Sequence, residues 1–494
     1  MSDGYQGEEI SCDLCIVGAG IAGLNALFAA SRHLSRQQKI VIVDRNPAPG
    51  GMWHTAYSYV RLHQPHPMFT AGNIAWTDGR APSYLASRDE VVAHLQRCFE
   101  ICRQAVTLDA RFGCVYRSHE EPAAGADVIV ECVSAGPDAE PLRIRTKRLV
   151  KAFGYDIQTN DPLPVASSHV RSISPNDFDI ASEELRTSTT PIYVVGAGKT
   201  GMDTAHELMT RYPQRKVSLV VGQGMLFLNR DQQFPSGLRR WWSGATPLGV
   251  FLDLAQRFDG RNETEVIEHM RRKYTLSLVP DARHFSYGLL SRAELATIAR
   301  GSHEIIRDYL VDVEDRDGRP TMLLRSGATR AIEPGSWLIN CTGYFSKRTQ
   351  PYEPYLSAGG RVLTIHPASS IHLLSTVSAY LLVHLWFSGE LHSLPLYEID
   401  TFELRDKSRE VSTVIGGSLM LYNMMLIMRR LPKSVLDEFG TDTARWYPLT
   451  RRVLDFMRMM RYQKKHPDHL QRSLDLVRER FDIRCGPLPH VARA

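Results

Sequence analysis

The feature that most constrains this chain is a glycine-rich turn between a strand and a helix, which occurs twice. In the first copy, the apolar run Cys12–Val17 predicts a buried strand and Leu24–Leu34 predicts a helix. Between them lie Gly18, Gly20 and Gly23. The first glycine permits the tight turn, the second lets a pyrophosphate approach the backbone, and the third lets helix and strand pack closely. The free N–H groups of the helix N-terminus then attract the phosphates.

A second buried strand, Lys39–Asp44, completes a strand–helix–strand unit. Asp44 ends this strand, where a carboxylate can accept hydrogen bonds from ribose hydroxyls. Arg45 follows it and joins the expected cofactor contacts. The unit therefore predicts a Rossmann-like domain that binds a dinucleotide, and FAD fits its acidic strand end.

The second copy of the turn lies in mid-chain, after a predicted strand over Ile192–Val195, and contains Gly196, Gly198 and Gly201. Lys199 and Thr200 stand within it, at the expected start of a helix. Because the strand, turn and helix recur in the same order, the sequence predicts a second dinucleotide site.

The two copies have the same spacing, since Asp44 and Gly222 each lie 26 residues after the first glycine of their motif. A carboxylate at the second position would repel a 2′-phosphate, and glycine removes that repulsion. The second site therefore favours NADPH over NADH. Lys199 and Arg230 are candidate phosphate partners, with ordinary surface charge as the alternative.

These patterns predict an α/β fold with two Rossmann-like dinucleotide-binding domains, a helical insertion and a helical C-terminal tail. Residues 1–160 and 330–396 are expected to form the FAD-binding domain. Residues 185–330 would form the NADPH-binding domain, with the insertion at about 223–307. Within and just after this insertion, the ranges Glu263–Tyr274 and Arg292–Tyr309 have helical patterns. Helical patterns after residue 396 predict a C-terminal module over 397–494. We expect the insertion and the tail to pack as one helical module.

Charge is concentrated in the tail, where residues 401–494 contain 18 Lys and Arg against 11 Asp and Glu, while the whole chain carries +5. Such a basic tail can bind nucleic acid or a membrane surface. It can equally be a solvated helix face, or carry arginines turned toward an anionic ligand. No nucleic-acid-binding module is visible, and the uncharged run Val411–Met428 favours a buried helix. We expect neither a nucleic-acid nor a membrane partner, and no metal site, with a homo-oligomer left open. The start of the chain lacks a secretory pattern, and the eight cysteines suggest no disulfide framework, which favours the cytoplasm.

Two further motifs carry a family resemblance. After the first unit comes Gly-Gly-Met-Trp, which contains Gly51, Met52 and Trp53, and a late Cys-Thr-Gly contains Thr342 and Gly343. With the two glycine turns, they resemble the class B flavin monooxygenases, a group of flavin-containing monooxygenases, Baeyer–Villiger enzymes and amino-acid N-hydroxylases. The resemblance covers roughly residues 10 to 390. It implies that these five residues lie at the cofactors.

One family motif is largely absent. The fingerprint Phe-x-Gly-x-x-x-His-Ser/Thr falls on Val165, Ser167, Arg171 and Ser172, so three of its four defined positions differ. This departure favours an outlier related to the N-hydroxylases over a typical flavin-containing monooxygenase or Baeyer–Villiger enzyme.

The resemblance also implies a reaction. NADPH would reduce the flavin, which would capture dioxygen as a hydroperoxide and pass one oxygen atom to a nucleophile. In the family, the stretch after the Gly-Gly-x-Trp motif lies near the flavin. We therefore expect His63 and Gln64 to donate hydrogen bonds there as catalytic residues. Support of a loop is the alternative for both.

The expected reaction is the N-hydroxylation of a small amine or amino acid with dioxygen, and L-aspartate, oxidised in successive steps to nitrosuccinate, is the first choice of substrate. The helical insertion and Arg-rich tail resemble L-aspartate N-hydroxylases (nitrosuccinate synthases), and an acidic amino acid needs guanidinium partners. Arg240 and Arg292 are the candidate substrate-binding residues, although a surface role suits each equally. The alternatives are N- or S-oxygenation, or Baeyer–Villiger oxidation, of another metabolite.

A pyridine-nucleotide disulfide reductase is the competing class, because it shares both glycine turns. Such an enzyme needs a thiol pair beside the flavin. Cys12 and Cys15 lie in the first predicted strand, and Cys98 and Cys102 lie four apart on a predicted helix. Packing explains both pairs better than thiol exchange does.

Overall fold

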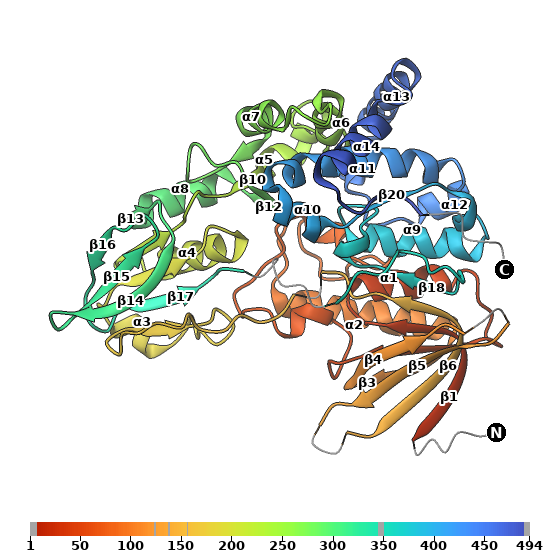
Figure 1. Ribbon diagram of the computed structural model, residues 1–494, viewed down its shortest axis with the longest axis horizontal. Coiled ribbons are helices and arrows are strands. Elements are labelled where there is room, and N and C mark those ends of the chain that lie inside the picture. Colours follow the sequence, from red (N-terminus) through yellow and green to blue (C-terminus); the bar gives the residue numbers. More distant parts are fainter. Residues whose placement is uncertain (1–6, 123–124, 137–138, 156, 344–349, 489–494) are drawn as a thin grey trace.

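The computed structural model describes residues 7–122, 125–136, 139–155, 157–343 and 350–488. Two sheet-containing lobes lie side by side, and helices from the middle and the end of the chain gather above them (Figure 1). The α/β fold predicted from the two glycine turns is confirmed.

The first lobe is built on a seven-stranded sheet in the order β3-β2-β1-β6-β5-β4, with β18 paired to β6. β1, β2, β3, β6 and β18 are parallel, and β4 and β5 extend the sheet as an antiparallel pair. Helix α1 packs against both α2 and α9. The elements are β1 (Glu8–Val17), α1 (Ile21–Ala30), β2 (Lys39–Asp44), α2 (Arg88–Ala105), β3 (Thr107–Phe112), β4 (Cys114–Glu120), β5 (Val128–Ser134), β6 (Pro141–Lys151), β18 (Val362–Thr364) and α9 (Ser375–Phe387).

The second lobe is built on a five-stranded parallel sheet in the order β13-β9-β8-β17-β7. Its strands run from residue 171 to residue 340, so the predicted limits of 185 and 330 both need correction. The elements are β7 (Arg171–Ile173), α3 (Glu183–Thr187), β8 (Ile192–Val195), α4 (Lys199–Arg211), β9 (Val217–Val220), β13 (Ser302–Ile306), β14 (Leu310–Arg316), β15 (Arg319–Leu324), β16 (Thr329–Ala331) and β17 (Trp337–Asn340).

The sequence predicted a helical insertion, but the insertion in the structure is not purely helical. It contains a small sheet, with β10 between β11 and β12. The expected helix over Arg292–Tyr309 is also wrong, because helix α8 ends at Gly301 and β13 then pairs with β9. The elements are β10 (Leu226–Asn229), α5 (Arg230–Gln233), α6 (Pro247–Arg257), α7 (Glu263–Tyr274), β11 (Thr275–Leu276), β12 (Phe285–Leu290) and α8 (Arg292–Gly301).

The tail packs onto the insertion through α11, which contacts α6, α7 and α14. Insertion and tail therefore form one helical module, as expected. Helix α11 is long and apolar enough to cross a membrane, but 72% of its most apolar window is buried inside the protein. The elements are β19 (Tyr397–Ile399), α10 (Thr401–Lys407), α11 (Arg409–Met428), α12 (Lys433–Asp437), α13 (Leu449–Lys465), α14 (His469–Phe481) and β20 (Cys485–Pro487).

Candidate active site

The first glycine turn leaves no room for side chains. Gly18 has a φ of +105°, and a Cβ on it would lie 2.8 Å from the carbonyl oxygen of Ala152. A Cβ on Gly23 would lie 1.7 Å from the carbonyl oxygen of Gly18. Gly20 caps helix α1 without a side-chain hydrogen bond, so the first N–H groups of the helix stay available. An anion placed before α1 would meet these groups and the positive end of the helix dipole.

The second turn repeats this geometry. Gly196 has a φ of +125°, and a Cβ on it would lie 2.6 Å from the carbonyl oxygen of Cys341. A Cβ on Gly201 would lie 2.1 Å from the carbonyl oxygen of Gly196. In front of Gly198 there is open space within 4 Å. Both turns therefore fit a phosphate group approaching the N-terminus of a helix.

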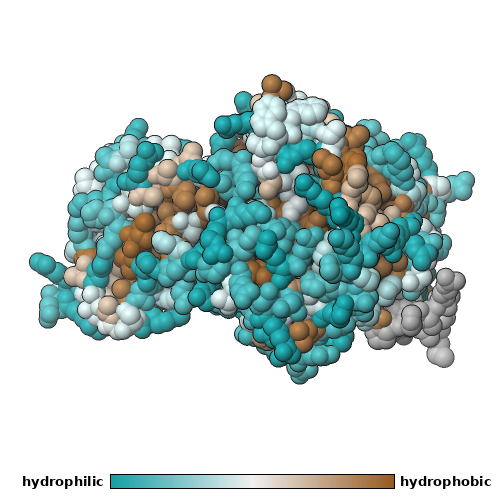
Figure 2. All heavy atoms as spheres, turned by 90° about the horizontal axis from the view of Figure 1, so that it is seen from above, coloured by the Kyte–Doolittle hydropathy of each residue, from teal (hydrophilic) through white to brown (hydrophobic). Residues whose placement is uncertain are grey.

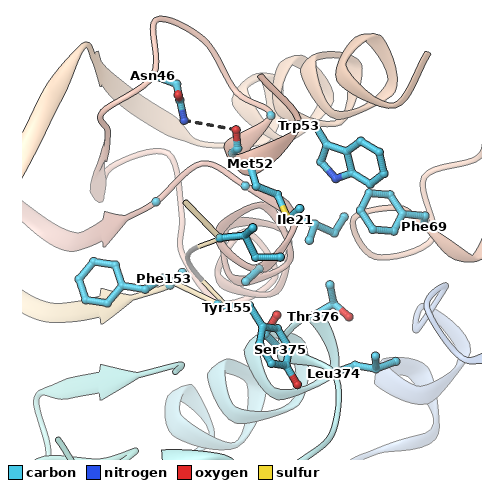
Figure 3. Close-up of a pocket in the computed structure, with 18 of the residues that line it drawn as sticks. Ile21, Asn46, Met52, Trp53, Phe69, Phe153, Tyr155, Leu374, Ser375 and Thr376 are labelled. Carbon is cyan, nitrogen blue, oxygen red and sulfur yellow. Dashed lines mark hydrogen bonds between the residues drawn. The ribbon is translucent and has the colours of Figure 1, made fainter. Parts of the chain in front are cut away.

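A cavity of about 470 Å³ begins at the end of β2 and passes the N-terminus of α1. Figure 3 shows Asn46, Met52 and Trp53 on one side of it, with Tyr155 and the start of α9 opposite. The predicted site residues that line this cavity are Gly18, Gly20, Asp44, Arg45, Gly51, Met52, Trp53, His63, Gln64 and Lys199. Its shape and lining fit an elongated dinucleotide such as FAD.

Asp44 holds the first turn together. Its Oδ2 accepts a hydrogen bond from the Ala19 N–H at 2.5 Å, and its Oδ1 accepts one from the Asn46 N–H at 2.8 Å. The Asn46 amide also donates to the Gly51 carbonyl at 3.4 Å (Figure 3). The acid at this strand end therefore orders both loops that border the cavity, a role additional to the ribose contact expected from the sequence.

The loop after Trp53 joins the two glycine turns. The Tyr57 hydroxyl donates to Asp203 Oδ2 at 2.8 Å, and the Tyr59 hydroxyl is hydrogen-bonded to Thr204 at 2.8 Å. Asp203 is ion-paired with Lys199, the first residue of α4, which also lines the cavity. The first turn and the helix of the second turn therefore border one cavity.

His63 is held as a neutral imidazole. Burial, reinforced by the neighbouring Lys199 and Arg230 cations, lowers the pKa of His63 to about 3. The Leu289 N–H donates to His63 Nδ1 at 3.4 Å, which leaves the ring proton on Nε2. A cavity-lining imidazole of this kind can donate a hydrogen bond at neutral pH, but it cannot serve as a general acid.

Arg230 lies beside this region without lining the cavity. It forms an ion pair with Glu294, and its Nη1 is buried without a hydrogen-bond partner. Thr200 lies in the first turn of α4. Thr342 lies behind the second glycine turn, where its methyl group comes within 3.2 Å of the position of a Gly196 Cβ, and Gly343 follows it.

The two candidate carboxylate anchors need correction. Arg240 and Arg292 are both exposed, and the cavity lining includes neither of them. A residue that binds a substrate carboxylate must reach the substrate cavity. We therefore assign substrate binding to neither arginine.

The neighbours of Gly222 could not be found from the sequence pattern. Gly222 has a φ of +55°, and a Cβ on it would meet the Tyr309 ring at 2.5 Å. The Arg325 guanidinium stacks on that ring, 4.1 Å from its centre. Arg325 thus places a cation near the C-terminal end of β9, where the 2′-phosphate of NADPH would lie. The Gly222 N–H donates a hydrogen bond to the Asp308 carbonyl.

All eight cysteines are free and buried. Cys98 and Cys102 pack in the core along α2, as expected. Cys114 lines the cavity, and its thiol is hydrogen-bonded to that of Cys132, a pair missed by the sequence analysis. The pair lies at the Asp44 end, because Gly113 next to Cys114 donates to the carbonyl of Asn46.

Comparison with known proteins finds similarity over part of the chain. Residues 12–238 match a family described as pyridine nucleotide-disulphide oxidoreductase. Uncharacterised proteins of Mycobacterium bovis and Mycobacterium tuberculosis are 25% identical over 357 residues, which is 68% of this chain. The matched region spans 60% of the length of these relatives.

Similar solved structures come from both enzyme classes. A flavin-containing monooxygenase from Stenotrophomonas maltophilia is 16% identical with a TM-score of 0.46, over 77% of this chain and 99% of that one. A cyclohexanone monooxygenase from Rhodococcus is 13% identical with a TM-score of 0.49, over 82% and 90%. A bacillithiol disulfide reductase from Staphylococcus aureus is 10% identical with a TM-score of 0.47, over 78% and 99%.

Proposed function

We propose that this chain is an FAD- and NADPH-dependent monooxygenase that transfers one oxygen atom from dioxygen to a small uncharged nucleophile. The observation that carries the proposal is that the first glycine turn and the start of helix α4, at Lys199 and Asp203, border one cavity. The same cavity is lined by the neutral imidazole of His63 and by Gln64. Its free buried cysteines suit the reducing cytoplasm.

Different residues would bind the two cofactors. Gly18 and Gly20 would hold the FAD pyrophosphate at the start of α1, and Gly51 and Trp53 would border the flavin half. The second turn, with Gly198 facing open space, would hold NADPH. FAD, when bound, supplies hydride acceptance from NADPH and activation of dioxygen.

The inner end of the cavity suits oxygen transfer. His63 can donate a hydrogen bond from Nε2 without changing its charge. The first turn of α9, with Ser375 and Thr376, presents a positive helix end to the cavity. Tyr57 and Tyr155 line the same space and limit the entry of water.

The lining also bears on the substrate. Two cations line the space near His63: Lys199 is neutralised by Asp203, and Arg61 donates to the Leu85 carbonyl at 3.2 Å. Aromatic and aliphatic side chains such as Tyr155, Tyr287 and Leu373 surround the space. An unpaired dicarboxylate would be costly to desolvate there. The proposal therefore favours a neutral amine or a sulfide over the acidic amino acid predicted from the sequence.

Disulfide reduction is the weaker alternative. Among the described residues, the thiol pair that reaches the cavity is Cys114 with Cys132, beside Asn46 and Asp44. A dithiol that exchanges electrons with a flavin must lie at its ring, whereas Asp44 marks the ribose end.

The test uses purified protein loaded with FAD. NADPH consumption is measured with a panel of neutral amines, sulfides and aspartate, and separately with low-molecular-weight disulfides. We expect consumption coupled to an oxygenated amine or sulfide. Stoichiometric reduction of a disulfide, without oxygenated product, would show that the protein is a disulfide reductase and not a monooxygenase.

A further inference from the structure

Exposed apolar side chains are concentrated on one surface, formed by residues 236–246 and 448–466. Of the thirteen large apolar side chains that are exposed among the described residues, nine belong to these two segments. Trp242 is 70% exposed, Leu238 71% and Leu449 68%. The nine are Leu238, Trp241, Trp242, Leu449, Val453, Leu454, Phe456, Met457 and Met460. We call this the α13 surface.

The two segments are fixed to each other as one surface. Arg451, in the first turn of α13, donates to the Gly244 carbonyl at 2.9 Å and also to the Ser243 carbonyl. Thr246 donates to the buried carboxylate of Asp455, in the middle of α13. These contacts keep Trp241 and Trp242 beside the helix.

Helix α13 exposes an apolar stripe. Leu449, Val453, Phe456 and Met460 are spaced by four, three and four residues, which places them on one face. An adjacent face packs on the protein through buried Asp455 and Met459. The helix projects from the helical module, away from both sheets (Figure 1), and apolar surface borders hydrophilic surface on that side of the molecule (Figure 2).

The α13 surface is strongly cationic. Its two segments contain eight Arg and Lys residues and one acid, Asp455, which is buried. The cations are Arg239, Arg240, Arg451, Arg452, Arg458, Arg461, Lys464 and Lys465. The partner must therefore be both apolar and anionic.

We propose that the α13 surface docks on an anionic lipid membrane, with α13 lying in the interface and Trp241 and Trp242 inserted beside it. Amphipathic helices with Lys and Arg next to Leu, Phe and Trp lie in the headgroup region, where the apolar side chains reach the acyl chains. Tryptophan is enriched at that depth, and cations are attracted by anionic headgroups. This replaces the expectation of no membrane partner.

A second copy of the chain fits this surface less well. In a two-fold dimer the same patch faces itself, so the cations of one α13 would meet those of the other. Within the two segments the only carboxylate, that of Asp455, is buried and already ion-paired with Arg458, so none is available to pair with the cations of a second copy.

The test is co-sedimentation of the full chain with vesicles of equal parts phosphatidylglycerol and phosphatidylcholine, against phosphatidylcholine alone. We expect binding to the anionic vesicles, weakened by salt, with a blue shift of tryptophan fluorescence. That shift should be lost in Trp241→Ser/Trp242→Ser. The variant Arg461→Glu/Lys464→Glu/Lys465→Glu should lose affinity on the order of a hundredfold, at about tenfold or less per cation.

The matched control reverses three exposed cations elsewhere, Arg103→Glu/Arg272→Glu/Arg319→Glu, and should bind as the wild type does. NADPH oxidation without vesicles should be equal in all variants, which shows that each is folded. Equal vesicle binding by the two triple variants, or no binding by the wild type, would overturn the proposal. A dimer in sedimentation velocity that Phe456→Ser/Met457→Ser dissociates, without vesicle binding, would instead assign the surface to a second copy.

Discussion

Replacing His63 by Asn tests the charge state on which the proposed role depends. The pKa of His63 falls from 6.5 to about 3 in the folded protein, mainly through burial. Between these two pH values, His63 binds more protons in the unfolded chain than in the folded protein. Protonation of His63 in the unfolded chain therefore lowers the free energy of unfolding as the pH falls from 6.5 toward 3. The slope is about 1.4 kcal/mol per pH unit. From pH 7 to pH 5.5 the wild type should therefore lose about 1.2 kcal/mol through this group.

The variant His63→Asn keeps an acceptor for the Leu289 N–H but cannot titrate. Its destabilisation relative to the wild type should therefore shrink by about 1.2 kcal/mol between pH 7 and pH 5.5. Urea unfolding of both proteins at the two pH values measures this difference, and other histidines with low pKa values cancel because both proteins contain them. A destabilisation that is equal at both pH values would refute the neutral, buried imidazole.

The neutral charge state of His63 also determines how the rate of product formation depends on pH. Because His63 is neutral above about pH 4, its replacement should lower product formation without changing the shape of the pH–rate profile from pH 6 to 9. Loss of a titration step near pH 6.5 in His63→Asn would show that the imidazole ionises during turnover.

Three further substitutions test the cofactor sites and the thiol pair. Gly20→Val should lose FAD because its side chain enters the path of the pyrophosphate, whereas Gly198→Val should keep FAD and raise the KM for NADPH; equal FAD content in both variants would contradict this. Arg325→Ala should raise the KM for NADPH by about tenfold, near the low end for a hydrogen bond to a charged group because the side chain is exposed, and should leave the KM for NADH unchanged. Parallel changes for both nucleotides would exclude a 2′-phosphate contact. Cys114→Ala/Cys132→Ala should retain product formation, and a folded, FAD-loaded double variant without turnover would restore the reductase class.

Local patterns predicted much of the fold. The observed bounds of Lys39–Asp44, Ile192–Val195 and Glu263–Tyr274 match those read from apolar periodicity. The glycine turns were recognisable because the backbone contacts of Gly18 and Gly196 require glycine, whatever surrounds them.

Features that depend on long-range pairing could not be predicted in this way. β17 reads as a buried strand, but nothing local assigns it to the second sheet. The Cys114–Cys132 contact arises from the antiparallel pairing of β4 and β5. Arg240 shows the same limit for function, since an arginine in an active site and one on a surface have the same sequence signature.

The most direct test of the account is incorporation of labelled dioxygen. The FAD-loaded protein is incubated with NADPH, isotopically labelled dioxygen and a panel of neutral amines and sulfides, and products are analysed by mass spectrometry. The account predicts one labelled oxygen atom in an amine or sulfide product, formed only with NADPH. NADPH consumption that yields only reduced disulfide, or only peroxide with every member of the panel, would contradict it.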